Sequence, residues 1–261
     1  SNSAVTATTD GIFLINSHWI GSGYETYRSG HHIKSGAELG QISTLGKLTA
    51  HFNITEAFLE AVAGLSTGQA LIQGDELLAF KGEKWEDEPS EIIPFSGALN
   101  LITRPWDIWS KNASELNLDF DLLTKDRFSA PIDATNTVIG DRVFLEEGAK
   151  ATASILNATS GPIYLAKNAE IMEGCIVRGG LALGESSALK MGAKIYGATT
   201  LGPHCKVGGE VNNSVIIGYS NKGHDGFLGN SALGEWCNLG ADTNNSNLKN
   251  NYDEVKAWSY V

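Results

Sequence analysis

Cysteine and methionine are scarce in this sequence, with three and two residues respectively among 261. The cysteines, Cys175, Cys205 and Cys237, contain no CxxC pair, and an odd, sparse set does not make a disulfide framework. Because such thiols usually stay reduced inside cells, we expect a cytoplasmic protein. No histidine stands at ligand spacing from a cysteine, so the sequence predicts no metal site.

Basic residues are also few: 19 lysines and arginines stand against 30 aspartates and glutamates, for a formal net charge of −11. A chain with this charge and no basic cluster is a poor partner for nucleic acid or an anionic membrane surface. A small phosphorylated ligand remains compatible, because a local pocket can be positive on a negative protein. No run of apolar residues approaches the 18 that suggest a transmembrane helix.

The second half of the sequence contains a repeat of six residues. Aliphatic side chains recur at every sixth position, and the residue four places after each is small or β-branched in all but one case. The aliphatic positions are Leu165, Ile171, Val177, Leu183, Leu189, Ile195, Leu201 and Val207, and the following positions are Ala169, Cys175, Leu181, Ser187, Ala193, Thr199, Cys205 and Val211. A period of six is neither helical nor a simple alternation, and it is typical of a β-helix.

In this interpretation each hexapeptide forms one face of a triangular coil, with the aliphatic residue inward and the small residue at a corner. Strands of successive coils then pair in parallel, and the segment from Ile139 to about Asn247 predicts roughly six coils. A glycine often follows the aliphatic residue, as in Leu201-Gly202, and we expect it to relieve a tight turn. The cysteines fall at the corner positions, which favours buried structural thiols.

The repeat loses its phase twice. The first break contains a turn sequence at residues 157–162, Asn-Ala-Thr-Ser-Gly-Pro. The second follows Val207 and spans residues 211–226. Insertions in a solenoid project from the stack and commonly carry ligand contacts, so we expect the second break to hold the functional residues.

Residues 1–130 lack the six-residue repeat and contain apolar runs and helical patterns, which predict a separate α/β domain; the β-helix is predicted in residues 131–261. Residues 11–16, 70–72 and 77–80 are apolar runs that predict strands, the last two joined at Gly74-Asp75. The domain contains neither GxGxxG nor GxxxxGKS/T, the glycine-rich loops that bind nucleotide phosphates.

Two helices are predicted in this first half. Residues 55–65 have an apolar face at Phe58, Leu59 and Val62, with a cap from Asn53 or Thr55. A second helix begins within residues 105–109, where a proline is tolerated in the first turn and Thr103 lies near the cap.

Several segments resemble GlmU-like enzymes, which are N-acetylglucosamine-1-phosphate uridyltransferases and glucosamine-1-phosphate acetyltransferases. The similarity is greatest to the GlmU-like sugar nucleotidyltransferases of bacteria of the Bacteroidetes type. It covers the last half of the chain well and the first half loosely. The segments are GHDGFLG at 223–229, LG at 233–234, NLGADT at 238–243, Asn247, EVNNSVI at 210–216 and, as the local marker of the first half, RPWD at 104–107.

This resemblance implies a left-handed parallel β-helix that forms a homotrimer, with acyl-transfer sites between the subunits. Acetyl-CoA would be the cofactor, and the small-molecule partner a sugar phosphate or nucleotide sugar; Mg²⁺ would be needed only with a complete nucleotidyltransferase domain. By position His224 would be the general base, a role suited to imidazole because it titrates near neutrality. The residues implied in substrate binding are Asn238, Asn247, Lys222, Phe227, Asn212 and Lys194.

The sequence also departs from the acetyltransferase pattern. Asn212-Asn213 stands where a lysine is usual, Phe227 replaces a tyrosine, and Asp242 replaces a glycine. The chain also stops at Val261, before the family's β-helix would end, which predicts an internal fragment or a truncated relative of a longer transferase.

Alternatives therefore stay open. His224 would be a surface histidine, and Asn238 and Asn247 members of a stacked asparagine ladder. The prism would then be a non-catalytic module that trimerises a degenerate domain or holds a sugar nucleotide. A metal-dependent hexapeptide enzyme is a distant third, because His204 and His224 are the only histidines in the β-helix.

Overall fold

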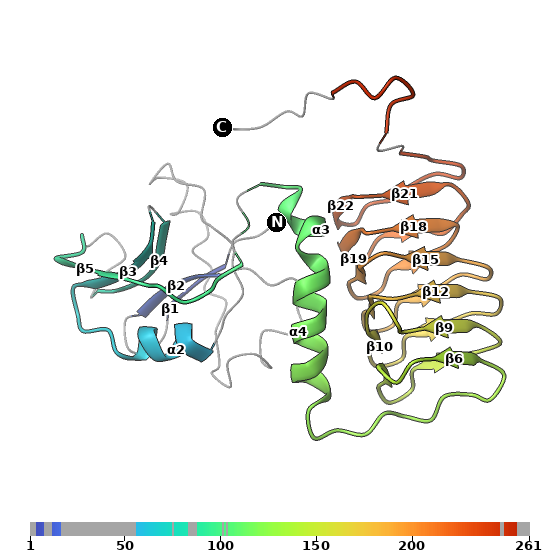
Figure 1. Cartoon of the computed structure of the whole chain (residues 1–261), viewed down its shortest axis with the longest axis horizontal. Helices are drawn as coiled ribbons and strands as arrows, with labels where there is room; N and C mark the ends of the chain where they lie inside the picture. The colour runs from blue at the N-terminus through green and yellow to red at the C-terminus, as the bar shows by residue number, and fades with distance from the viewer. Residues whose placement is uncertain are drawn as a thin grey trace. The chain divides into compact units, whose positions relative to one another are not determined.

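The computed structural model describes residues 4–7, 12–16, 56–74, 76–82, 88–100, 102, 104–245 and 248–254. The chain divides into two compact units, Ser1–Phe128 and Ser129–Val261. Figure 1 labels the helices and strands of each unit.

The first unit holds a five-stranded sheet in the order β1-β2-β4-β3-β5. All neighbours are antiparallel except β3 and β5, which are parallel. The predicted strands within residues 11–16, 70–72 and 77–80 are confirmed as β2, β3 and β4. The strands are β1 (Ala4–Ala7), β2 (Ile12–Asn16), β3 (Gln69–Gln73), β4 (Glu76–Lys81) and β5 (Glu91–Pro94).

Three helices are described in this unit: α2 (Glu56–Ala63), α3 (Asp107–Ser110) and α4 (Asn112–Thr124). Helix α2 confirms the first predicted helix, and its Phe58 and Val62 are buried against the sheet residues Leu71 and Leu78. The caps expected from Asn53, Thr55 and Thr103 lie outside the described residues. The N-cap of α3 is Trp106, which caps with no side-chain hydrogen bond.

The second unit is a left-handed parallel β-helix, which confirms the predicted fold class (Figure 1). Three parallel sheets form its faces, with six, five and six strands, in agreement with roughly six coils. Sheet I holds β7 (Val143–Leu145), β10 (Ile163–Leu165), β13 (Leu181–Leu183), β16 (Thr199–Leu201), β19 (Val215–Gly218) and β22 (Ala232–Glu235). Sheet II holds β8 (Lys150–Ala151), β11 (Glu170–Ile171), β14 (Ala188–Leu189), β17 (Lys206–Val207) and β20 (Asn221–Lys222). Sheet III holds β6 (Thr137–Ile139), β9 (Ile155–Asn157), β12 (Ile176–Arg178), β15 (Lys194–Tyr196), β18 (Glu210–Asn212) and β21 (Phe227–Gly229).

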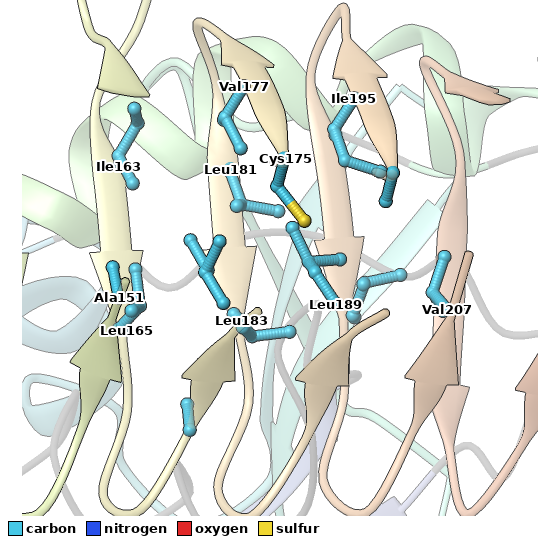
Figure 2. Close-up of a cluster of buried hydrophobic side chains, with 14 of the residues drawn as sticks. Ala151, Ile163, Leu165, Cys175, Val177, Leu181, Leu183, Leu189, Ile195 and Val207 are labelled. Carbon is cyan, nitrogen blue, oxygen red and sulfur yellow. The ribbon is translucent and has the colours of Figure 1, made fainter. Parts of the chain in front are cut away.

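The chain runs from sheet I to II to III in every coil, and we name the corners I–II, II–III and III–I accordingly. All eight predicted aliphatic positions from Leu165 to Val207 are at most 1% exposed, as are the eight residues that follow them by four. Figure 2 shows some of these side chains inside the coils, with Leu183, Leu189 and Val207 among the labelled residues. Their complete burial stabilises each coil on its neighbour, and deleting one such side chain would cost about 2–5 kcal/mol.

The second break in the repeat is not the projecting insertion that the lost phase suggests. Leu183 pairs with Leu201, 18 residues on, but Leu201 pairs with Ile216, only 15 residues on. Residues 211–226 therefore continue the coil with shortened corners, and the segment stays in the stack. The first break is a lengthened coil, since Leu145 pairs with Leu165, 20 residues on.

Candidate functional site

Three of the seven sequence-predicted site residues, Lys194, Asn212 and Phe227, lie on the last three strands of sheet III, β15, β18 and β21 (Figure 1). Strand alternation turns Ile195, Val211 and Leu228 into the core, so the residues on either side of each face outward. The parallel register aligns Lys194 with Glu210 and Phe227 in one column, and Tyr196 with Asn212 and Gly229 in the other. We call these six residues the sheet III face.

Glu210 lies at the centre of the polar contacts on this face. The Tyr196 hydroxyl donates to Glu210 Oε1 at 2.5 Å, and Lys194 Nζ lies 3.5 Å from Oε2. The hydrogen bond from Tyr196 lowers the pKa of Glu210, with a further contribution from Lys194, and the same bond raises the pKa of Tyr196. These contacts favour the ionised carboxylate, which forms an ion pair with Lys194, the one cation among the six residues of the sheet III face.

Phe227 and Asn212 form the less charged part of the face. The ring of Phe227 lies over Gly229, where a Cβ atom would stand only 2.6 Å from a ring carbon. The Phe227 backbone N–H donates to Asn244 Oδ1 at 2.7 Å, which ties the next turn of chain to β21. Both side chains are partly exposed, so this half offers an apolar ring beside an amide.

His224 stands in the II–III corner, in the short loop between β20 and β21, and its side chain is exposed. Within the described residues its imidazole makes no hydrogen bond or ion pair, whereas its backbone carbonyl accepts from Lys222 Nζ at 2.9 Å. The loop leads directly into Phe227, at the edge of the sheet III face. An unbonded imidazole can accept a proton from a bound ligand.

Lys222 does not face a substrate from the surface. It occupies an inward position of sheet II, in register with Val207, and only 2% of it is exposed. Its Nζ donates to the carbonyls of Gly208, at 3.0 Å, and His224. Burial lowers its pKa below the ordinary value, and the charge of Asp225 opposes that shift. Gly209 leaves room for the ammonium, since a Cβ there would stand 2.9 Å from Nζ.

Asn238 lies away from the sheet III face. It forms an isolated parallel bridge with Asn221 of sheet II, and its Oδ1 accepts from Asn221 Nδ2 at 3.1 Å. A second pair of this kind joins Asn213 and Asn230. Asn238 is therefore a member of an asparagine ladder in this structure, and Asn247 lies outside the described residues.

In the first unit, the RPWD segment forms a compact turn at the start of α3. The backbone N–H of Arg104 donates to Asp107 Oδ2 at 3.0 Å, and the Arg104 guanidinium lies 6.0 Å from the centre of the Trp106 ring. Asp107 also pairs with Lys111 at 3.9 Å. These contacts hold the turn in place through one hydrogen bond, one ion pair and one contact between a cation and an aromatic ring.

Two of the cysteine thiols lie inside the β-helix. Cys175 and Cys205 are fully buried, and burial raises the pKa of both thiols, as expected for structural residues. In the parts of the chain that the structure describes, no group of three or more His, Cys, Asp or Glu side chains could hold a metal ion. No helix among the described residues is long and apolar enough to cross a membrane.

Sequence reasoning missed the part that Tyr196 plays beside Glu210. The signal was present: Tyr196 precedes Gly197 just as Asn212 precedes Asn213, so the two share a position in successive coils. A column-by-column alignment of coils would have placed both on one face.

The comparison with known protein families finds a match within the first unit. A family model described as sugar nucleotidyl transferase matches residues 47–128, the stretch that contains α2 and the RPWD turn, and leaves the β-helix outside the match. No curated protein matches the chain. The match supports a transferase role, with small sugar phosphates or nucleotides as the substrate class.

Proposed function

We propose that this chain transfers an acetyl group from acetyl-CoA to an amino sugar or amino-sugar phosphate, in the synthesis of a nucleotide sugar resembling UDP-N-acetylglucosamine. The observation that carries the proposal is that one chain contains both a segment that matches sugar nucleotidyl transferases and a hexapeptide β-helix. The first supplies the sugar-phosphate chemistry, and the second is the fold that the resemblance associates with acyl transfer.

His224 is the general base of the proposed reaction. The acceptor arrives as an ammonium and must lose a proton before its nitrogen can attack the thioester carbonyl. The imidazole takes that proton, and the neutral nitrogen attacks to form the C–N bond. As the C–S bond breaks, the second proton lost by the nitrogen passes to the departing sulfur, and CoA leaves as the thiol. The exposed side chain of His224, with no partner of its own among the described residues, supports this role.

The sheet III face is the proposed surface for the acceptor. Phe227 offers an apolar ring for the sugar, Asn212 an amide for its hydroxyls, and Lys194 a positive charge for a phosphate. Lys222 acts indirectly in this proposal: its bond to the His224 carbonyl holds the loop that carries the base.

The test is acetyl transfer to glucosamine 1-phosphate, followed by release of the CoA thiol. His224→Ala should lower the rate by about 10²–10⁴-fold, the usual contribution of a general base, without changing the melting temperature. Asp225→Asn is the matched control, because it alters the same loop and leaves the imidazole. An unchanged rate in His224→Ala would remove the histidine from the mechanism.

The second candidate function is a non-catalytic module that trimerises the protein. The pairing of Asn238 with Asn221 favours it, because a ladder amide has a structural use of its own. It predicts that neither wild type nor any variant releases CoA thiol, while self-association persists.

A further inference from the structure

The I–II corner of the last coils carries a column of aromatic rings that the proposed function does not use. His204 stacks on Tyr219 with ring centres 5.2 Å apart and planes 21° apart, and Tyr219 stacks on Trp236 at 4.9 Å and 11°. All three are exposed, Trp236 to 76%. Each ring belongs to a different coil, so the column follows the direction in which the coils stack.

Each of these three residues holds a left-handed backbone, with φ values of 55°, 49° and 60°. In the coils below, the same corner position is held by Asn168 and Ser186, which are small. A left-handed conformation costs an L-residue with a large side chain about 1–2 kcal/mol. Asn168 and Ser186 have the same left-handed φ, so the corner itself requires it; what distinguishes the last three coils is that a large exposed ring stands there in place of a small residue.

A polar column runs beside the aromatic one. Lys206, Asn221 and Asn238 follow the three aromatic residues by two positions each, and they align in the parallel register of sheet II. The Oδ1 atom of Asn238 is occupied by Asn221, so its Nδ2 remains to donate outward. In the last coil, the two columns therefore place the flat indole of Trp236 next to the amide donor of Asn238.

We infer that Trp236 and Asn238 form a binding platform for the base of a nucleotide. One face of the indole is covered by Tyr219, and in the described part of the chain no ring covers the other. Tyr252 is 79% exposed and makes no ring contact with Trp236. A planar base continues the near-parallel column by one step, and an amide is the side-chain group that reads base edges.

Among the described residues, the Trp236 end of the column leaves one face of the indole without a stacked ring, so this end accepts one flat ring. The platform lies on the I–II corner and sheet II, away from the sheet III face, and so goes beyond the proposed acetyl transfer.

Equilibrium dialysis of the full chain with labelled uridine monophosphate tests the inference. Wild type should bind saturably in the millimolar range or below, and Trp236→Ala should weaken binding about 5- to 150-fold, the factor that corresponds to the roughly 1–3 kcal/mol of a base–aromatic stack. Trp236→Phe keeps a flat ring and should retain most of the affinity. Met191→Ala, which removes an exposed apolar side chain at another corner, should bind as wild type does.

Three results would overturn the inference, provided that circular dichroism confirms folding of each variant. They are the absence of saturable binding to wild type, equal binding by Trp236→Ala, and Trp236-dependent binding of N-acetylglucosamine 1-phosphate in place of the nucleotide. Asn238→Ala should weaken uridine monophosphate binding while ribose 5-phosphate, which lacks the base, binds to neither protein.

Discussion

Lys222 occupies a position where every lower coil of sheet II has an apolar side chain, from Ala151 to Val207. Two opposing effects, each of about 1–3 kcal/mol, accompany its replacement by methionine. The variant no longer buries an ammonium, but it leaves the carbonyls of Gly208 and His224 without their donor. At neutral pH we therefore expect a change in unfolding free energy within about 1 kcal/mol, measured by urea unfolding.

The pH dependence of the same variant is more decisive. Because burial lowers the pKa of Lys222 below 10.5, the unfolded chain binds more protons than the folded chain between the lowered value and 10.5. Wild type should therefore gain stability relative to Lys222→Met as the pH rises through that window. Leu239→Met, in the same inward column, serves as a control and should show no such trend. A constant difference between wild type and Lys222→Met would mean that the ammonium is hydrated.

At the scale of the elements, glycines after the aliphatic positions are explained by the approach of the next coil. A Cβ on Gly202 would stand 1.7 Å from the Ile217 carbonyl oxygen, whereas one on Gly234, in the last coil, would meet nothing within 4 Å. Gly202→Ala should destabilise the protein by about 3 kcal/mol or more, because backbone must move. Gly234→Ala is the matched control and should be nearly neutral in a thermal unfolding experiment.

These glycines also mark what the sequence could predict about the coils. The inward columns follow directly from the period of six, because burial requires an aliphatic side chain at every turn. The expected reason for Gly202 was wrong: a tight turn would give a left-handed φ, and Gly202 has none. Close approach between coils depends on register, and the register after Val207 changes through corner shortening that a fixed period does not reveal.

The sheet III face was predictable only in part for the same reason. Lys194, Asn212 and Phe227 were identified through the resemblance, and the register brings them together on one face. Lys222 and Asn238 are separated from them because shortened corners place Lys222 inward and align Asn238 with Asn221. Sequence spacing alone does not distinguish an inward from an outward position once the phase is lost.

The cluster around Glu210 provides a second prediction at this scale. Its side chain is partly exposed, so its ion pair with Lys194 is screened and contributes little to stability. Glu210→Gln should lower the unfolding free energy by less than about 1 kcal/mol, measured by urea unfolding. If Lys194 binds a phosphate, the same variant should lower the KM for a phosphorylated acceptor, because the lysine loses a competing carboxylate. An unchanged KM would assign Lys194 to a structural pair only.

At the scale of the whole molecule, the lower part of sheet III is unusually apolar for an exposed surface. Ile155 and Ile176 are adjacent in register and 40% and 48% exposed, and Met191 at the neighbouring corner is 68% exposed. An apolar patch on one face of a prism is suited to self-association. It lies on the same sheet as Lys194 and Phe227, so association through it would bring another subunit towards the sheet III face.

A charged substitution on this patch tests the homotrimer that the resemblance to GlmU-like enzymes implies. Ile155→Glu with Ile176→Glu should convert the trimer into a monomer, as measured by light scattering after gel filtration, because two carboxylates would be buried without partners in the interface. Leu118→Glu, at an exposed position of α4, is the control and should leave the assembly intact. If the acyl-transfer site lies between subunits, the monomer should lose acetyl transfer while keeping its far-ultraviolet circular dichroism. A monomeric wild type would contradict the trimer, and activity in the monomer would place the site within one chain.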